Sequence, residues 1–287
     1  MPVSLTPVFT VVVPLYNTER YIARTLESVR TQSFGDFEVI IVDDGSSDSG
    51  PALVAAMMID DARIRMVRQP NRGLAGARNT GIRHARGKYL AFLDADDLWL
   101  PRKLEAHRAQ LDADPTIGLA YAPSLFIDQD DKALGFGQTP KLTDIDADHV
   151  LCRNPVGNGS APVLRRAALD AIEFEIATLE GRRRCWFDES FRQSEDIELW
   201  TRIAATTSWR IEGVPEPLTL YRVHTAALSS NTAAQLETWY RFRAKIESIA
   251  PDLIARSGAR SEAYQLRYLA RRSAMNGNGG EACRLAA

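Results

Sequence analysis

The chain has 287 residues, of which 45% are hydrophobic and 25% charged, and 35 Lys and Arg against 37 Asp and Glu leave a formal net charge of −2. This composition is ordinary for a soluble globular protein and excludes a wholly disordered, collagen-like or coiled-coil chain. The near-zero charge disfavours a dedicated nucleic-acid-binding protein. At roughly 150 residues per domain, the length allows two domains or one large α/β domain with an appendage.

The three cysteines, Cys152, Cys185 and Cys283, are odd in number and form no Cys-x-x-Cys pair. We therefore expect neither a disulfide framework nor a zinc site. Free thiols fit a reducing compartment. The opening residues lack the basic and apolar stretches of a signal peptide, and the longest apolar runs are far shorter than the ~20 residues that span a membrane. These features predict a cytoplasmic protein.

The first part of the chain alternates short apolar, β-branched runs with amphipathic segments. Such a β-α order predicts a mainly parallel sheet with helices on both faces. Ligands of such sheets bind beyond the carboxyl ends of the strands, so the residues just after each strand are the candidates for function. The predicted strands are 8–14, 37–42, 64–67 and 88–93, and the predicted helices are 19–31, 51–60, 74–84 and 101–111.

The rest of the chain is less regular. Pro215 and Pro217 make 211–220 an edge strand or an extended loop, because proline has no N–H for a sheet ladder. The other predicted elements are a strand at 118–126, a turn at 128–131, a Gly/Asn loop at 154–160, a helix at 194–205 and a helical region from 226 to about 275.

The turn that follows the first predicted strand, 14–17, contains no glycine. It therefore lacks the Gly-rich fingerprint of dinucleotide-binding folds. It also lacks the Gly-rich, Arg/Lys-containing loop that a sugar-nucleotide pyrophosphorylase would need. The nearest Walker-type match has the wrong spacing, and no Gly-x-Ser-x-Gly nucleophile elbow occurs.

Three aspartates, Asp94, Asp96 and Asp97, follow the fourth predicted strand. Side chains at i and i+2 of an extended segment point the same way, so Asp94 and Asp96 can converge on one hard cation such as magnesium or manganese. The alternative is that they cap the following helix. A cap needs only one carboxylate, and three so close together repel unless a positive charge lies among them. The spacing favours a metal site.

Taken together, the strand-end motifs resemble a family 2 glycosyltransferase with the GT-A fold, and the resemblance covers roughly residues 8–230. Each motif alone is modest, but their order makes a chance match improbable. The motifs are Pro14-Leu15-Tyr16-Asn17, Asp43-Asp44-Gly45-Ser46, Asn71-Arg72-Gly73 with Ala77-Arg78-Asn79, Asp94-Ala95-Asp96-Asp97, Glu195-Asp196 and Tyr221-Arg222-Val223-His224.

The resemblance implies an inverting enzyme that moves a sugar from a nucleotide sugar, most often UDP-linked, to a hydroxyl acceptor. Tyr16 would lie beside the donor's base with Pro14 in backbone contact, and Asp44 would accept a hydrogen bond from the base. Without the resemblance, the Asp44 turn reads equally well as a plain turn and helix cap. Asn17 and Ala95 complete the implied nucleotide-sugar contacts.

The same resemblance implies the groups that perform the chemistry. Asp96 would hold a divalent metal (manganese or magnesium) on the diphosphate, with Asp94 on the metal or the ribose. Asp196 would be the general base, although an acidic first helix turn also has a purely structural explanation. The remaining implied contacts are Arg78 near the base or diphosphate, and Arg222 and His224 near the diphosphate or metal.

The resemblance also implies a domain plan and partners. We expect a GT-A (Rossmann-like) α/β domain over 1–230, with a nucleotide-binding half at about 1–115 and an acceptor half at about 116–230, and a helical tail over 231–287. The acceptor would be a glycan or lipid-linked glycan of bacterial surface glycan biosynthesis. The basic tail helix either contacts anionic lipid or packs on the catalytic domain, and packing is the simpler expectation. The rival functions are an inactive nucleotide-sugar-binding module and a sugar-nucleotide pyrophosphorylase.

Overall fold

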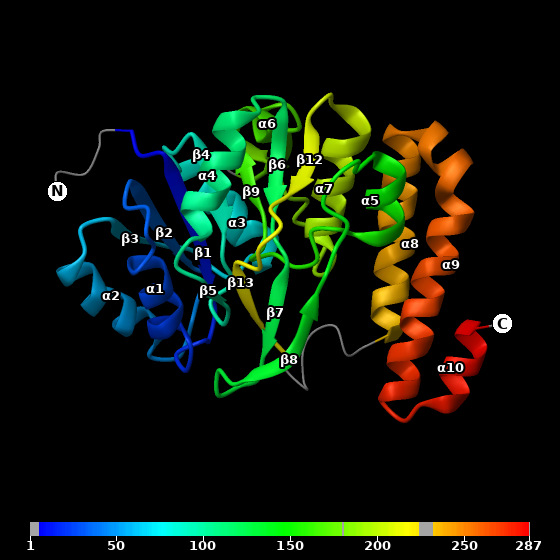
Figure 1. Ribbon diagram of the computed structural model, residues 1–287, viewed down its shortest axis with the longest axis horizontal. Coiled ribbons are helices and arrows are strands. Elements are labelled where there is room, and N and C mark those ends of the chain that lie inside the picture. Colours follow the sequence, from blue (N-terminus) through cyan, green and yellow to red (C-terminus); the bar gives the residue numbers. More distant parts are fainter. Residues whose placement is uncertain (1–5, 180, 224–231, 287) are drawn as a thin grey trace.

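The computed structural model describes residues 6–179, 181–223 and 232–286. Its centre is a seven-stranded sheet in the order β12-β6-β9-β4-β1-β2-β3 (Figure 1). Within this sheet β9 alone runs antiparallel to its neighbours. The mainly parallel sheet is therefore confirmed. Its strands are β1 (Phe9–Leu15), β2 (Phe37–Asp43), β3 (Ile64–Arg68), β4 (Tyr89–Phe92), β6 (Ile117–Tyr121), β9 (Val163–Arg165) and β12 (Arg210–Gly213).

Helices cover both faces of this sheet because its central strands are apolar on both sides. Val11 and Val13 of β1 belong to the core beneath one set of helices, and Val12 belongs to the core beneath the other. A Cβ on Gly81 would lie 2.2 Å from Val12 Cγ1, so a glycine is needed where α3 approaches β1. The first set is α1 (Ile22–Arg30), α2 (Gly50–Asp60) and α4 (Lys103–Ala113), and the second includes α3 (Gly73–His84), α6 (Arg166–Asp170) and α7 (Glu195–Thr206).

The strand expected at 118–126 is wrong, because the chain divides into β6 and β7 (Ser124–Ile127) in two different sheets. Pro123 lies between them and has no N–H to continue a ladder. The second sheet has the order β5-β13-β7-β8, with β5 (Leu98–Trp99), β13 (Thr219–Arg222) and β8 (Ala133–Gln138). The edge strand or extended loop expected at 211–220 is confirmed only in part. β12 lies at the edge of the larger sheet and Pro215 and Pro217 lie in the loop that follows it, but the segment ends in β13, an interior strand of the second sheet.

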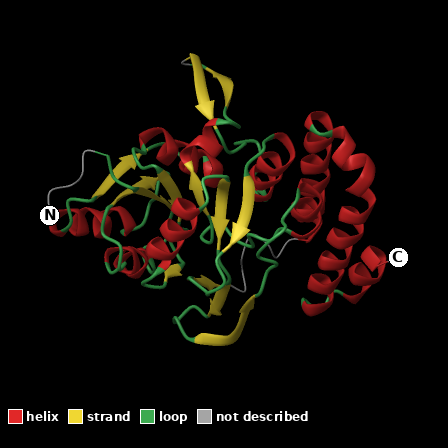
Figure 2. Cartoon of the chain, turned by 45° about the horizontal axis from the view of Figure 1, so that its top comes forward, coloured by secondary structure: helices red, strands yellow, loops and turns green. Residues whose placement is uncertain are grey.

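An antiparallel hairpin stands out from the body of the molecule (Figure 2). It is formed by β10 (Phe174–Thr178) and β11 (Gly181–Cys185), and the sequence patterns did not predict it. Two arginines of β11 form ion pairs with nearby glutamates: Arg182 pairs with Glu175 of β10, and Arg184 pairs with Glu173, which directly precedes β10.

The C-terminal region is helical, as expected: α8 (Thr232–Ile249), α9 (Pro251–Met275) and α10 (Gly279–Ala286). These helices stand beside α5 (Ala147–Arg153) at one end of the molecule (Figure 1). They have an apolar core of their own, in which Trp239, Phe242 and Ile254 pack with Leu151 of α5. Among the described helices, none has the length and hydrophobicity required to cross a bilayer.

Candidate active site

The loop between β4 and β5 carries the acidic motif. Asp94 and Asp96 are partly exposed, whereas Ala95 and Asp97 are buried. The amide of Asp94 donates to Ser160 Oγ at 3.0 Å, and the carbonyl of Ala95 accepts from Thr25 Oγ1 at 2.9 Å. The backbone of the loop is therefore held by hydrogen bonds to Ser160 and Thr25, while the carboxylates of Asp94 and Asp96 remain partly exposed.

Asp97 has a structural position that the sequence did not reveal. Its side chain is fully buried, and it accepts hydrogen bonds from Ser160 Oγ at 2.6 Å and from the amide of Arg222 at 2.8 Å. Burial, reinforced by the charges of Asp96 and Asp94, raises the pKa of Asp97 well above its ordinary value. Asp97 thus joins the acidic loop to β13 and to the loop containing Ser160.

Arg78 of α3 lies between two carboxylates. Its Nη1 donates to Glu195 Oε1 and its Nη2 to Asp94 Oδ1, both at 2.7 Å. The side chain is almost completely buried and also lies over the ring of Phe187. Burial by itself lowers the pKa of Arg78, but the charges of Asp94, Glu195 and Asp196 outweigh it and raise the pKa. This guanidinium therefore links the acidic loop to the beginning of α7.

Close packing keeps Arg78 in this bridge. A Cβ on Gly159 would lie 2.1 Å from Arg78 Nη2 and 3.0 Å from Asp94 Oδ2. Glycine at 159 is thus the reason that the loop over 154–160 can cover the ion pair. The family resemblance places this loop in the acceptor half, but its contact with Arg78 and Asp94 was not foreseen.

The first turn of α7 carries Glu195 and Asp196, preceded by Ser194 in the left-handed region with φ 61°. Asp196 Oδ1 accepts from the amide of Ile197 at 2.7 Å. Burial raises the pKa of both carboxyls; the charge of Arg78 opposes the rise, and that of Asp94 adds to it. Both groups therefore hold their protons more tightly than ordinary carboxyls, which is the property expected of a base that works near neutral pH.

Arg222 reaches the same loop from β13. Its Nε donates to the carbonyl of Asp96 at 2.6 Å, its Nη1 donates to the carbonyl of Asp128 at 2.6 Å, and its Nη2 pairs with Asp131. The guanidinium also lies 4.5 Å from the ring centre of Tyr21. Arg222 is therefore buried and holds the acidic loop against the turn that follows β7. The residue after Val223, His224, lies outside the described residues.

The ends of β1 and β2 form the neighbouring part of the site. Pro14 lies in β1 opposite Val42, beyond the point where β4 pairs with β1, so its missing N–H leaves no gap in the ladder. Tyr16 follows and is 52% exposed, which leaves its ring free to contact a ligand from solvent. Asn17, with φ 52°, accepts from the amide of Ser47 at 2.8 Å and so joins the two strand-end loops.

Asp44 is buried beside the beginning of α3. Its Oδ1 accepts from Gln69 Nε2 at 2.6 Å and from the amide of Arg72 at 2.9 Å, and its Oδ2 accepts from the amide of Gly73 at 2.8 Å. Three protein donors thus occupy most of the acceptor capacity of one carboxylate. Asp44 orients the helix that carries Arg78, in addition to any contact with a nucleotide base.

Most of the residues that the motifs singled out therefore lie along one edge of the sheet. The linked set is Asp94, Asp96, Asp97, Arg78, Glu195, Asp196 and Arg222, and the adjoining strand ends carry Pro14, Tyr16, Asn17 and Asp44. Within the described residues no group of three metal-binding side chains is found. Two partly exposed carboxylates on one turn nevertheless fit magnesium or manganese, since such ions use one or two protein carboxylates together with substrate phosphates.

The chain is similar in sequence to known glycosyltransferases. Residues 10–172 match the family model described as glycosyl transferase family 2. The uncharacterized glycosyltransferase alr2836 of Nostoc sp. is 31% identical over 227 residues, which are 75% of this chain and 65% of that protein. The putative glycosyltransferase EpsH of Bacillus subtilis is 44% identical over 95 residues, 33% of this chain and 27% of EpsH. The chain thus spans between about a quarter and two thirds of the length of these relatives.

Solved structures show the same fold. The mannosyltransferase PcManGT from Pyrobaculum calidifontis, in complex with GDP-Man and Mn²⁺, superposes with a TM-score of 0.66 at 22% identity, over 98% of this chain and 74% of that one. S. aureus TarS in complex with UDP-GlcNAc superposes with a TM-score of 0.64 at 20% identity, over 93% and 72%. These likenesses establish the GT-A fold. With the family model covering more than half of the sequence, the chain belongs to glycosyl transferase family 2.

Proposed function

We propose that the protein is an inverting, metal-dependent glycosyltransferase that moves a sugar from a UDP-sugar to a hydroxyl acceptor. The observation that carries the proposal is the bridge Asp94–Arg78–Glu195, because it ties the partly exposed acidic loop to the turn that bears Asp196. A metal-holding group and a proton acceptor are thereby built into one rigid network.

In the proposed reaction, the acceptor oxygen forms a bond to the anomeric carbon while the bond from that carbon to the diphosphate oxygen breaks. The acceptor proton passes to the carboxylate of Asp196. A general base of this kind contributes typically 10²–10⁴-fold to the rate. A divalent metal held by Asp96 and Asp94 would supply a Lewis acid on the leaving diphosphate. Arg78 holds the acidic loop and the first turn of α7 together through its hydrogen bonds to Asp94 and Glu195.

The donor side of the proposal rests on the ends of β1 and β2. Tyr16 offers an exposed ring to the base, and Asn17, Asp44, Ala95 and Arg222 shape the surrounding loops. We assign 1–115 to nucleotide binding, 116–230 to the acceptor, and 231–287 to a helical tail. The complex of TarS with UDP-GlcNAc supports a UDP-sugar, and that of PcManGT with GDP-Man and Mn²⁺ makes GDP-mannose the alternative donor to test.

The setting we propose is cytoplasmic, in the biosynthesis of a bacterial surface glycan or its lipid-linked precursor. The described cysteines are all unpaired, as expected in a reducing compartment. For the tail, α9 contacts the catalytic body directly: Ser261 Oγ donates to the carbonyl of Leu151 at 2.8 Å, and Ile254 shares an apolar core with Leu151 and Phe191. These contacts support packing on the catalytic body over contact with a lipid surface. Co-sedimentation with anionic liposomes, with and without residues 259–287, tests this choice. Liposome binding by the full chain that is lost on truncation would favour the lipid-contact hypothesis instead.

Two substitutions test the function. Asp196→Asn should abolish transfer while leaving the affinity for UDP with Mn²⁺ nearly unchanged, as measured by calorimetry. Asp96→Ala should lose the metal-dependent part of nucleotide binding. Asp252→Asn, which removes an acid from the first turn of α9 away from the site, is the matched control and should retain activity.

The outcomes separate the rival functions. Normal turnover by Asp196→Asn would remove Asp196 as the base. Nucleotide binding without donor hydrolysis or transfer in the unmodified protein would indicate a binding module. Formation of a nucleotide sugar from a sugar 1-phosphate and a nucleoside triphosphate would indicate a pyrophosphorylase.

A further inference from the structure

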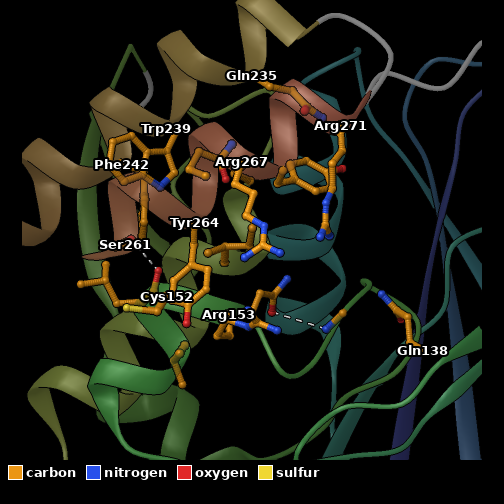
Figure 3. Close-up of a pocket in the computed structure, with 18 residues that line it drawn as sticks. Gln138, Cys152, Arg153, Gln235, Trp239, Phe242, Ser261, Tyr264, Arg267 and Arg271 are labelled. Atoms are coloured by element: carbon orange, nitrogen blue, oxygen red, sulfur yellow. Dashed lines mark hydrogen bonds between the residues drawn. The ribbon is translucent and has the colours of Figure 1, made fainter. Parts of the chain in front are cut away.

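A cavity of about 550 Å³ lies between α5, α8, α9 and the beginning of α7 (Figure 3). Its size is within the range of small-molecule sites in proteins, 300–1,000 Å³ as an order-of-magnitude range. Aromatic rings form part of its wall, including the buried Trp239 and the half-buried Tyr264. The cavity is therefore large enough for a sugar ring and offers flat apolar surfaces against which one can lie.

The charged side chains that line this cavity, among the described residues, are all positive. Arg153, Arg267 and Arg271 line it, and none of its described lining residues is an aspartate or glutamate. Figure 3 shows the three guanidinium groups projecting into the same space. Arg267 and Arg271 are one helical turn apart on α9 and so lie on one face of it. Since the whole chain carries a formal charge of −2, this cluster is a local feature and not a reflection of overall composition.

These arginines lack the anionic partners that other arginines of the same region have. Arg256 of α9 pairs with Asp148, but none of the three cavity arginines forms an ion pair with a described residue. Arg153 instead lies over the ring of Tyr264 at 4.7 Å. The buried Oε1 of Gln235, another lining group, accepts no hydrogen bond from the described protein. Like charges held together without a counter-charge favour an anion between them.

The cavity adjoins the proposed base. Ser194 and Ile197, which flank Asp196 in sequence, both line it. Asn154 and Gly157 line it as well, and they belong to the loop whose Gly159 lies against Arg78 and Asp94. A molecule in this cavity therefore lies next to the helix turn that bears Asp196.

We propose that this cavity is the acceptor subsite and that its arginines hold an anionic group, a phosphate or carboxylate, of a sugar acceptor; this inference rests on the transferase function proposed above. Guanidinium groups match phosphate and carboxylate oxygens with paired hydrogen bonds. The rings of Trp239 and Tyr264 provide the surface for the sugar, and Gln235 Oε1 accepts from one of its hydroxyls.

Calorimetry with four probes tests the subsite: glucose, α-glucose 1-phosphate, glucose 6-phosphate and glucuronate. The unmodified protein should bind at least one charged sugar about tenfold more tightly than glucose, the effect of one or two hydrogen bonds to a charged group. The double variant Arg267→Gln/Arg271→Gln should lose this preference. Both arginines are exposed, so the variant should keep its fold and its Tm.

Arg284→Gln is the matched control, because Arg284 lies on α10 outside the cavity lining and is also exposed. It should retain the preference for the charged sugar. Equal binding of glucose and all charged sugars by the unmodified protein, or an unchanged preference in the double variant, would overturn the proposal. Donor hydrolysis and binding of UDP with Mn²⁺ are measured in parallel; their absence refutes the transferase function, whereas failure of the anion preference alone refutes only the subsite.

Discussion

Replacing Arg78 with methionine tests the central bridge of the site. The substitution keeps the length of the aliphatic stem but removes both hydrogen bonds at 2.7 Å, to Glu195 and to Asp94. Breaking a buried ion pair by removing one partner costs about 3–5 kcal/mol. Glu195 is 4% exposed, whereas the side chain of Asp94 is 24% exposed and recovers some hydration. We therefore expect the lower end of that range, about 3 kcal/mol, in the free energy of unfolding.

The penalty should depend on pH. Arg78 lowers the pKa of Glu195, which burial raises, so removal of Arg78 raises that pKa further. A carboxyl with a raised pKa in the folded state stabilises the protein at low pH, and this contribution is lost as pH rises through the folded-state pKa. The loss of stability caused by Arg78→Met should therefore be smaller at about pH 5 than at about pH 8, with a slope of at most about 1.4 kcal/mol per pH unit.

Urea unfolding of the unmodified protein and of Arg78→Met at both pH values measures these effects. The double variant Arg78→Met/Glu195→Gln should recover part of the loss at the higher pH, because no buried charge then remains at position 195. A penalty below about 1 kcal/mol, or the same penalty at both pH values without recovery in the double variant, would refute the idea that Arg78 neutralises Glu195.

Two further substitutions examine the packing around the site. Gly159→Ala should displace Arg78 from Asp94 and weaken Mn²⁺-dependent binding of UDP, whereas Gly35→Ala, where a Cβ meets no atom within 4 Å, should not; equal affinities in calorimetry would contradict this. Lys103 is fully buried and donates to the carbonyl of Ala161 at 2.8 Å, and burial lowers its pKa to about 7. A lowered pKa contributes stability at high pH that is lost as pH falls toward 7, so Lys103→Met should flatten the rise in unfolding free energy between neutral and alkaline pH; parallel profiles in urea unfolding would contradict it.

Much of the architecture was predictable from local pattern. The four strands predicted in the first half became β1 to β4. β1, β2 and β4 are buried along their whole length, which a largely apolar segment allows, whereas β3 is the partly buried strand at the edge of the sheet. The strand expected at 118–126 failed since Pro123 divides it between two sheets. The hairpin of β10 and β11 was missed because its arginine-rich strand resembles a solvated loop in composition.

The candidate site, like the fold, was predictable from the sequence only in part. Spacing singled out Asp94 and Asp96, and the resemblance to the family singled out Asp196, although carboxylates at the start of a helix also have purely structural uses. Arg78 was selected too, but its pairing with Asp94 and Glu195 was not predicted, since Asp94 is 16 residues away and Glu195 117 residues away along the chain. Nothing in the sequence indicated the burial of Asp97 or the role of Gly159.

The sequence by itself determined the family, the succession of strands and helices, and the loops that carry the candidate chemistry, because these depend on short-range patterns of apolar and acidic residues. Only the tertiary structure decided which charges meet. It brought Arg78 between Asp94 and Glu195, placed Arg222 against the acidic loop, and gathered Arg153, Arg267 and Arg271 around one cavity. Ion pairs and cavities arise from helices and strands that pack across long chain separations, and no local pattern encodes that packing.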